Sequence, residues 1–186
     1  MLAHSGPTLA LLGLLALAGG MKAASPDATS GALRAAGLPH ARVLVQGMGL
    51  VEVLIGVSGI VLGSSIPAVA AAGFYAGFTW FVVHALRHQL PISSCGCFGA
   101  NDTPPSVNHL IVNIGAVLVL LMAGFFPIGP WGGIGRLTPG LAVAFIGFTA
   151  GTIYILYGIL AVLPRVQSGR SETTRRPSPT RAGSPL

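Results

Sequence analysis

The only two cysteines of this 186-residue chain, Cys95 and Cys97, are separated by one glycine in a short polar segment between two hydrophobic spans. Such a pair can form a small disulfide ring, open to two thiols, or bind a metal through two soft ligands. Residues two apart in an extended strand lie about 7 Å apart, whereas a disulfide needs alpha carbons about 4.4–6.8 Å apart. Gly96 and Gly99 allow the required bend, and the strain that remains would raise the reduction potential. The pattern favours thiol–disulfide exchange over a structural crosslink.

Basic side chains precede the cysteine pair along the chain. Arg87 and His88 lie fewer than ten residues before Cys95, and positive charge near a thiol favours its thiolate form. They are therefore candidate thiolate stabilisers for attack on a partner disulfide. The alternative is that they only anchor the end of a span at the membrane interface.

A metal site is the main alternative for the cysteines. His84 and His88 are four residues apart on one helical face, and with Cys95 and Cys97 they would form a Cys2His2 set that suits zinc. The cysteine spacing argues against this, because structural zinc sites separate their cysteines by about two to four residues. We expect no bound cofactor, with zinc or a quinone as the alternatives left open.

Composition identifies a membrane protein. The chain is 52% hydrophobic and 8% charged, with a mean hydropathy of +0.78. These values lie far outside the range of soluble domains. A bilayer crossing needs roughly 20 apolar residues, and lipid cannot satisfy free backbone groups, so the spans must be helices. The sequence predicts an all-α, multi-pass transmembrane bundle with spans near 7–21, 43–62, 66–86, 107–126 and 138–163. The first span lacks a basic start and a clear cleavage site, so we expect it to be retained.

Glycines four residues apart occur in three of these spans. The pairs are Gly59/Gly63, Gly73/Gly77 and Gly147/Gly151. This small-xxx-small spacing lets helix backbones approach closely. In a chain so rich in glycine, the same spacing can also arise by chance.

Glu52 is the one acidic residue inside a span, ten residues after Arg42 and about 15 Å along a helix. A carboxylate at that depth should face the bundle and find a partner, and Lys22 on the neighbouring span is the expected one. Glu52 then either holds neighbouring helices together through a polar contact, which we favour, or binds a proton or a quinone. Asn113 is expected to hydrogen-bond a neighbouring helix or the cysteine loop, and His109 to be solvated at the interface.

Positive charge is concentrated in the C-terminal segment. Five arginines between Arg165 and Arg181 account for half of the basic residues. The composition of this segment predicts a disordered basic tail, and the positive-inside rule places it in the cytoplasm, with the cysteines on the same side. A stable disulfide is not expected in that reducing compartment. Without a basic patch on a folded face, nucleic-acid binding is not expected, and no motif supports hydrolase or nucleotide chemistry.

The sequence resembles the MauE family of methylamine utilisation, within the wider DoxX-like group of membrane proteins. The resemblance covers about 9–124 and rests on an ordered set of motifs: Gly20-Met21-Lys22, Ser25-Pro26-Asp27, Ala32-Leu33, Gly37-Leu38-Pro39, Glu52, Phe78-Thr79, Cys95-Gly96-Cys97-Phe98-Gly99 and Asn113. It implies a four-helix domain over 1–127. The additional helix expected over 128–164 and the basic tail over 165–186 lie outside the resemblance.

The resemblance also implies a function in a cell membrane. Such proteins are thought to act with a thioredoxin-like partner to mature or export a disulfide-rich client, the small subunit of methylamine dehydrogenase. Similar proteins occur as redox-associated membrane components outside that pathway. Two other functions stay open: a non-catalytic assembly factor whose cysteine loop docks a partner or binds metal, and a small transporter.

Overall fold

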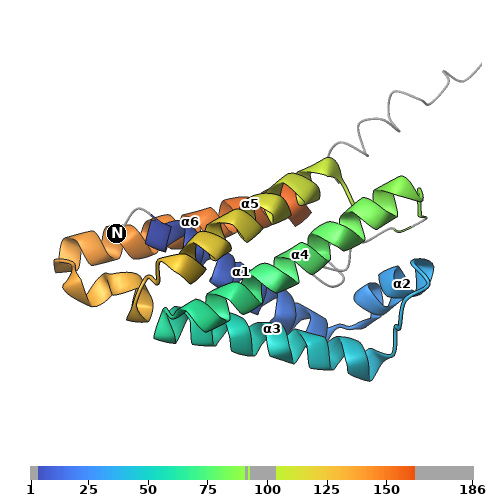
Figure 1. Ribbon diagram of the computed structural model, residues 1–186, viewed down its shortest axis with the longest axis horizontal. Helices are drawn as coiled ribbons and strands as arrows, with labels where there is room; N and C mark the ends of the chain where they lie inside the picture. The colour runs from blue at the N-terminus through green and yellow to red at the C-terminus, as the bar shows by residue number, and fades with distance from the viewer. Residues whose placement is uncertain (1–3, 91, 93–103, 162–186) are drawn as a thin grey trace, which may run out of the picture.

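Five long apolar helices dominate the computed structural model, which describes residues 4–90, 92 and 104–161. Figure 1 shows them running side by side along the long axis of the molecule. They are α1 (Ser5–Ala24), α3 (Arg42–Leu62), α4 (Ser65–Arg87), α5 (Val107–Phe125) and α6 (Pro139–Ala161). Each is long and apolar enough to cross a membrane, and the described residues form no strand. The predicted all-α, multi-pass bundle is confirmed.

Two shorter elements connect the long helices. The helix α2 (Asp27–Ala35) lies between α1 and α3. It is too short and too polar to be detected as a membrane span from the sequence, yet Thr29, Ser30 and Ala32 are buried. The 3-10 element η3 (Pro130–Arg136) joins α5 to α6.

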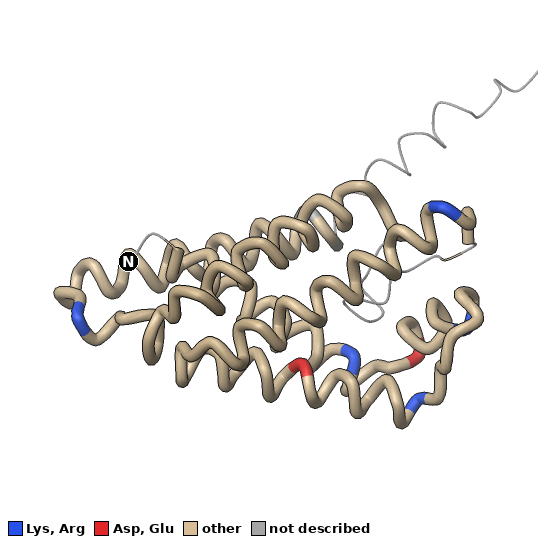
Figure 2. The backbone as a smooth tube through the Cα atoms, viewed as in Figure 1, with Lys and Arg blue, Asp and Glu red and all other residues tan. Residues whose placement is uncertain are grey.

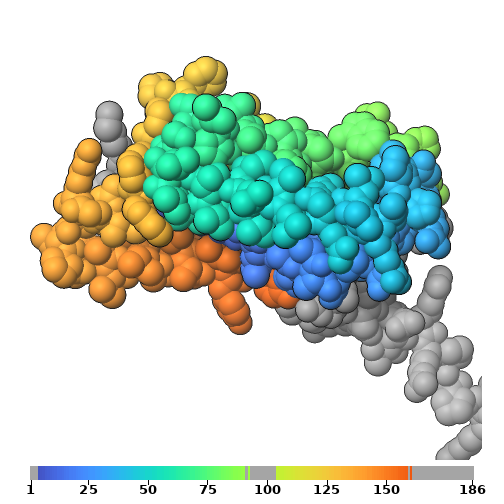
Figure 3. Space-filling model, turned by 90° about the horizontal axis from the view of Figure 1, so that it is seen from below, coloured from blue at the N-terminus to red at the C-terminus, as the bar shows by residue number. Residues whose placement is uncertain are grey.

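The first helix forms the centre of the bundle. It contacts α3, α4, α5 and α6, and more of it is buried than of any other described span. In Figure 3, α1 shows only as a blue strip between α3 and α6. Its leucines Leu11, Leu12, Leu14 and Leu15 are all buried. The first helix therefore supplies much of the core of the described bundle.

The closest helix contact is between α1 and α3, and glycines make it possible. A methyl group at Gly19 would lie 2.7 Å from Cβ of Glu52, and one at Gly49 would lie 2.9 Å from the backbone nitrogen of Ala23. Both distances are shorter than real Cβ contacts allow. A methyl group at Gly56 would likewise lie 2.9 Å from Cβ of Ala16. The two backbones therefore approach along most of their shared length.

The glycine pairs predicted from spacing are used differently. Gly59 packs on Leu12, and Gly63 ends α3 in the left-handed conformation with φ of 57°. A methyl group at either member of the other two pairs would meet no atom of the described structure within 4 Å. Helix packing at Gly73/Gly77 and Gly147/Gly151 is therefore not observed.

Charge is distributed unequally between the two ends of the bundle. Lys22, Arg34, Arg42 and Arg87 belong to the end that carries α2, whereas Arg136 lies in η3 at the other end. Figure 2 shows this asymmetry. It agrees with the charge pattern used to orient the chain, but the assignment of that end to the cytoplasm remains a prediction. The basic tail lies outside the described residues.

Candidate functional site

A buried ion pair joins α1 to α3. Nζ of Lys22 lies 2.7 Å from both Oε1 and Oε2 of Glu52. The side chains are 1% and 0% exposed. The predicted partner of Glu52 is confirmed. The close contact between Gly19 and Gly49 beside the pair brings α1 and α3 near enough for the Lys22 and Glu52 side chains to meet deep in the bundle.

A third helix contributes an aromatic ring to this pair. Nζ of Lys22 lies 4.4 Å from the centre of the Phe78 ring on α4, a distance at which a cation is attracted to the ring face. The attraction to the ring offsets part of the cost of burying the two charged side chains, since removing charges from water is very costly. The arrangement links α1, α3 and α4 and agrees with the interpretation that Glu52 holds neighbouring helices together through a polar contact.

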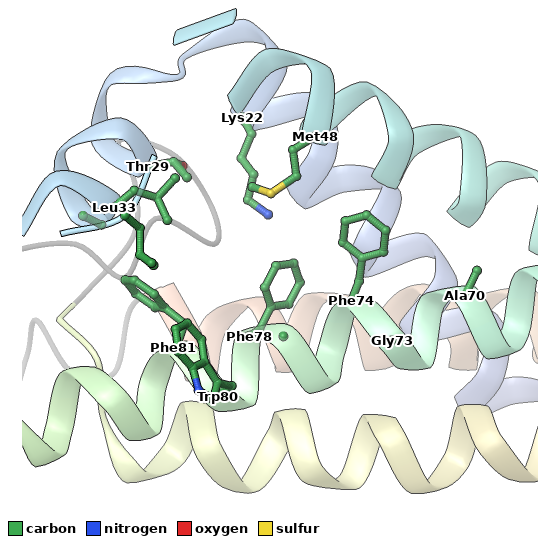
Figure 4. A pocket seen from close by; sticks show the side chains of 13 residues that line it. Lys22, Thr29, Leu33, Met48, Ala70, Gly73, Phe74, Phe78, Trp80 and Phe81 are labelled. Atoms are coloured by element: carbon green, nitrogen blue, oxygen red, sulfur yellow. The ribbon is translucent and has the colours of Figure 1, made fainter. Parts of the chain in front are cut away.

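A pocket of about 480 Å³ opens beside the ion pair, between α2, α3 and α4. Figure 4 shows Leu33 of α2 and Met48 of α3 facing Phe74 and Phe78 of α4 across it. Lys22 is the only charged residue in the described lining. This pocket was not predicted from the sequence. A signal was present in the sequence, because Gly73 and Gly77 of α4 are each followed by a phenylalanine. The four-residue spacing of the two glycines favoured a helix-packing surface instead.

The polar residues of α5 lie on its inner face. His109 is 1% exposed and Asn113 is 5% exposed, and Nδ1 of His109 lies 2.8 Å from Oγ of Ser106. The prediction of a solvated His109 was wrong, because α5 turns this residue toward α1 and α4 rather than toward the interface. Nδ2 of Asn113 has no hydrogen-bond partner among the described residues. Both side chains line a cavity of about 20 Å³, which is large enough for one water molecule.

The residues predicted to serve the cysteines lie at the end of α4. Arg87 is its last residue and His88 its C-cap, and both are exposed. The ring centres of His84 and His88 are 4.5 Å apart, and His84 stacks on Trp80. Cys95 and Cys97 lie outside the described residues. No group of three or more metal-ligating side chains occurs within residues 4–90, 92 and 104–161, and the zinc set remains a prediction.

A family model described as "Methylamine utilisation protein MauE" matches residues 2–127. The chain belongs to the MauE family. The match includes the helices α1 to α5 with Lys22, Glu52 and Asn113, and it also includes Cys95 and Cys97. Comparison with curated proteins and with solved structures found no match.

Membership and the apolar helices together identify an integral membrane accessory protein of the MauE type. The match ends directly after α5, so α6 is an addition to the matched region. None of the residues in the apolar window of α6 is buried. This MauE protein therefore has its polar pair, its pocket and its central helix in the matched region.

Proposed function

We propose that this MauE protein supports maturation of a partner protein by thiol–disulfide exchange at Cys95 and Cys97. The observation that carries the proposal is the cysteine pair itself, in the segment joining α4 to α5 of a MauE-family protein. The redox partner is a thioredoxin-like protein, the client is a disulfide-containing protein, and the pathway is methylamine metabolism. The protein lies in the cell membrane, with its basic tail in the cytoplasm.

The exchange follows from ordinary disulfide chemistry. A client thiolate attacks one sulfur of a Cys95–Cys97 disulfide, forms a mixed disulfide and releases the other cysteine as a thiolate. A second client thiolate then attacks the mixed disulfide, which gives an oxidised client and a reduced cysteine pair. The client loses two electrons and two protons. The thioredoxin-like partner, in its disulfide form, takes both from the pair and restores it.

Basic side chains at the end of α4 complete the proposal. Arg87 and His88 stabilise the cysteine thiolates, consistent with their exposure at the end of α4. The exchange requires no cofactor. The alternative is a non-catalytic assembly factor in which the Cys-Gly-Cys segment only docks a partner.

Trapping the mixed disulfide tests the exchange. In the Cys97→Ser variant the Cys95 thiolate attacks the disulfide of the thioredoxin-like partner but no second thiol resolves the mixed disulfide, so we expect an adduct with that partner on non-reducing gels that reducing agent removes. The Cys95→Ser/Cys97→Ser variant is the matched control and should give none. If Cys97→Ser forms no adduct and Cys95→Ser/Cys97→Ser still matures the client, the assembly-factor function is the correct one.

Sidedness is measured separately with a membrane-impermeant maleimide. For cysteines on the cytoplasmic side, the reagent should label Cys95 and Cys97 in inverted vesicles but not in intact cells. Labelling in intact cells would place the pair on the outer side and reverse the assigned orientation.

A further inference from the structure

The pocket between α2, α3 and α4 is far larger than the buried ion pair requires. We propose that it binds a neutral, membrane-dissolved molecule that has a flat apolar ring and a ring carbonyl, the chemical class of the quinones. In the bound state the carbonyl oxygen accepts a hydrogen bond from Nζ of Lys22. The proposal concerns binding alone and is independent of the cysteine chemistry.

The size and walls of the pocket fit a ring-shaped ligand. Its volume of about 480 Å³ lies within the range of roughly 300–1,000 Å³ that is usual for small-molecule sites. Phe74, Phe78, Trp80 and Phe81 supply aromatic surface from α4, and Leu33 of α2 faces them (Figure 4). Flat rings pack well against such surfaces in stacked or edge-to-face arrangements.

Lys22 supplies the single strong donor in this apolar lining. An ammonium group has three N–H donors, and the structure gives Nζ two acceptor oxygens, both on Glu52. Figure 4 shows the Lys22 amine directed into the pocket, toward the Phe78 ring. Lys22 is 1% exposed and its Nζ lies against the Phe78 ring, so a carbonyl that enters from the pocket side takes the place of that ring as the partner of the remaining N–H.

The charge balance of the site selects a neutral ligand. Lys22 and Glu52 form a pair of opposite charges, so the wall carries a donor without a net charge. An anionic headgroup would meet the Glu52 carboxylate at close range, and either kind of ion would have to lose its hydration in an apolar space. A ring carbonyl accepts the hydrogen bond without that cost.

The pocket is accessible from the surface that faces lipid. Gly73, Gly77 and Trp80 line it, and all three are exposed on the membrane-spanning helix α4. Because neither glycine has a side chain, the wall of the pocket is open at that point. A ligand dissolved in the bilayer enters from the side, between α3 and α4.

Fluorescence quenching of Trp80 tests the proposal on the full chain. The chain has two tryptophans, so Trp131→Phe leaves Trp80 as the only reporter, and Cys95→Ser/Cys97→Ser removes any reaction with thiols. The probe is 2,3-dimethyl-1,4-naphthoquinone, titrated into the protein in detergent micelles. We compare Gly77→Leu, which fills the pocket, with Gly115→Leu on α5, where a side chain also meets open space. Lys22→Met/Glu52→Leu removes the donor together with its partner charge.

We expect saturable quenching in the parent and in Gly115→Leu, and none above micelle partitioning in Gly77→Leu. Lys22→Met/Glu52→Leu should bind the probe about tenfold more weakly, as loss of a hydrogen bond from a charged donor predicts. Non-saturable quenching in the parent, or binding that survives Gly77→Leu, overturns the pocket assignment. If excess hexadecane displaces the probe and the double variant binds it as well as the parent, the pocket is an acyl-chain groove and the proposal is wrong.

Discussion

Glycines on α1 and α3 occupy a different environment from glycines on α4. At Gly19 and Gly49 the two backbones approach so closely that a single added methyl group would collide with the neighbouring helix, whereas at Gly73 and Gly77 the space is open. One set closes an interface and the other lines a pocket. The role of a small residue in a membrane helix therefore depends on whether another helix packs against it.

The Lys22–Glu52 pair lies at the boundary between these two regions. Its carboxylate side belongs to the closed α1–α3 contact, and its ammonium side borders the pocket. The pair thus both holds the bundle together and supplies the polar group of the pocket. Substitutions on either side of this boundary separate the two contributions.

The largest effect is expected at the ion pair. Glu52→Leu leaves Lys22 buried without its partner charge, which should lower the free energy of unfolding by about 3–5 kcal/mol. SDS-induced unfolding of the purified protein in mixed micelles measures it. The control, Lys22→Met/Glu52→Leu, removes both charges and should be much closer to the parent. Equal losses in the single and double variants would show that the site contributes through packing rather than charge.

A smaller effect is expected where a side chain is added to the closed interface. Gly19→Leu forces α1 away from α3 and should lower the free energy of unfolding by about 3 kcal/mol. Gly77→Leu should stay within about 1 kcal/mol of the parent, since it enters open space on a helix. The same unfolding assay compares them. Similar values for both would mean that α4 packs as closely as α3 does.

The smallest effect is expected at the surface ion pair between α2 and α3. Asp27 and Arg42 are 2.7 Å apart, and their side chains are 70% and 73% exposed. Asp27→Asn should therefore change the free energy of unfolding by less than about 1 kcal/mol, and 1 M salt should remove the difference by screening. A loss as large as that of Glu52→Leu would mean that α2 is held mainly by this contact.

Much of the fold follows from local patterns. Each of the five spans forms a helix close to its predicted limits, because a bilayer crossing requires a run of apolar residues that hydropathy detects directly. The pairing of Glu52 with Lys22 was also predictable. A buried acid requires a partner, and only one basic residue ends the neighbouring span at a reachable depth.

Other features required the packed structure. The helix α2 was missed because its short, mixed sequence lacks an apolar run, and His109 was assigned to solvent because its position near a span end does not reveal which way the helix turns it. The pocket was missed because its lining comes from four successive helices, α1 to α4, and only their packing brings these side chains around one space.

The sequence by itself determined that this is a multi-pass membrane protein of the MauE type, with one buried acid, one nearby cation and a single pair of adjacent cysteines. These properties depend on residue type and local spacing. Only the tertiary structure decided which glycines close an interface, which line a pocket, and that the ammonium of Lys22 faces an aromatic space. The rotation and depth of each helix set these contacts, and both are determined by packing against neighbours.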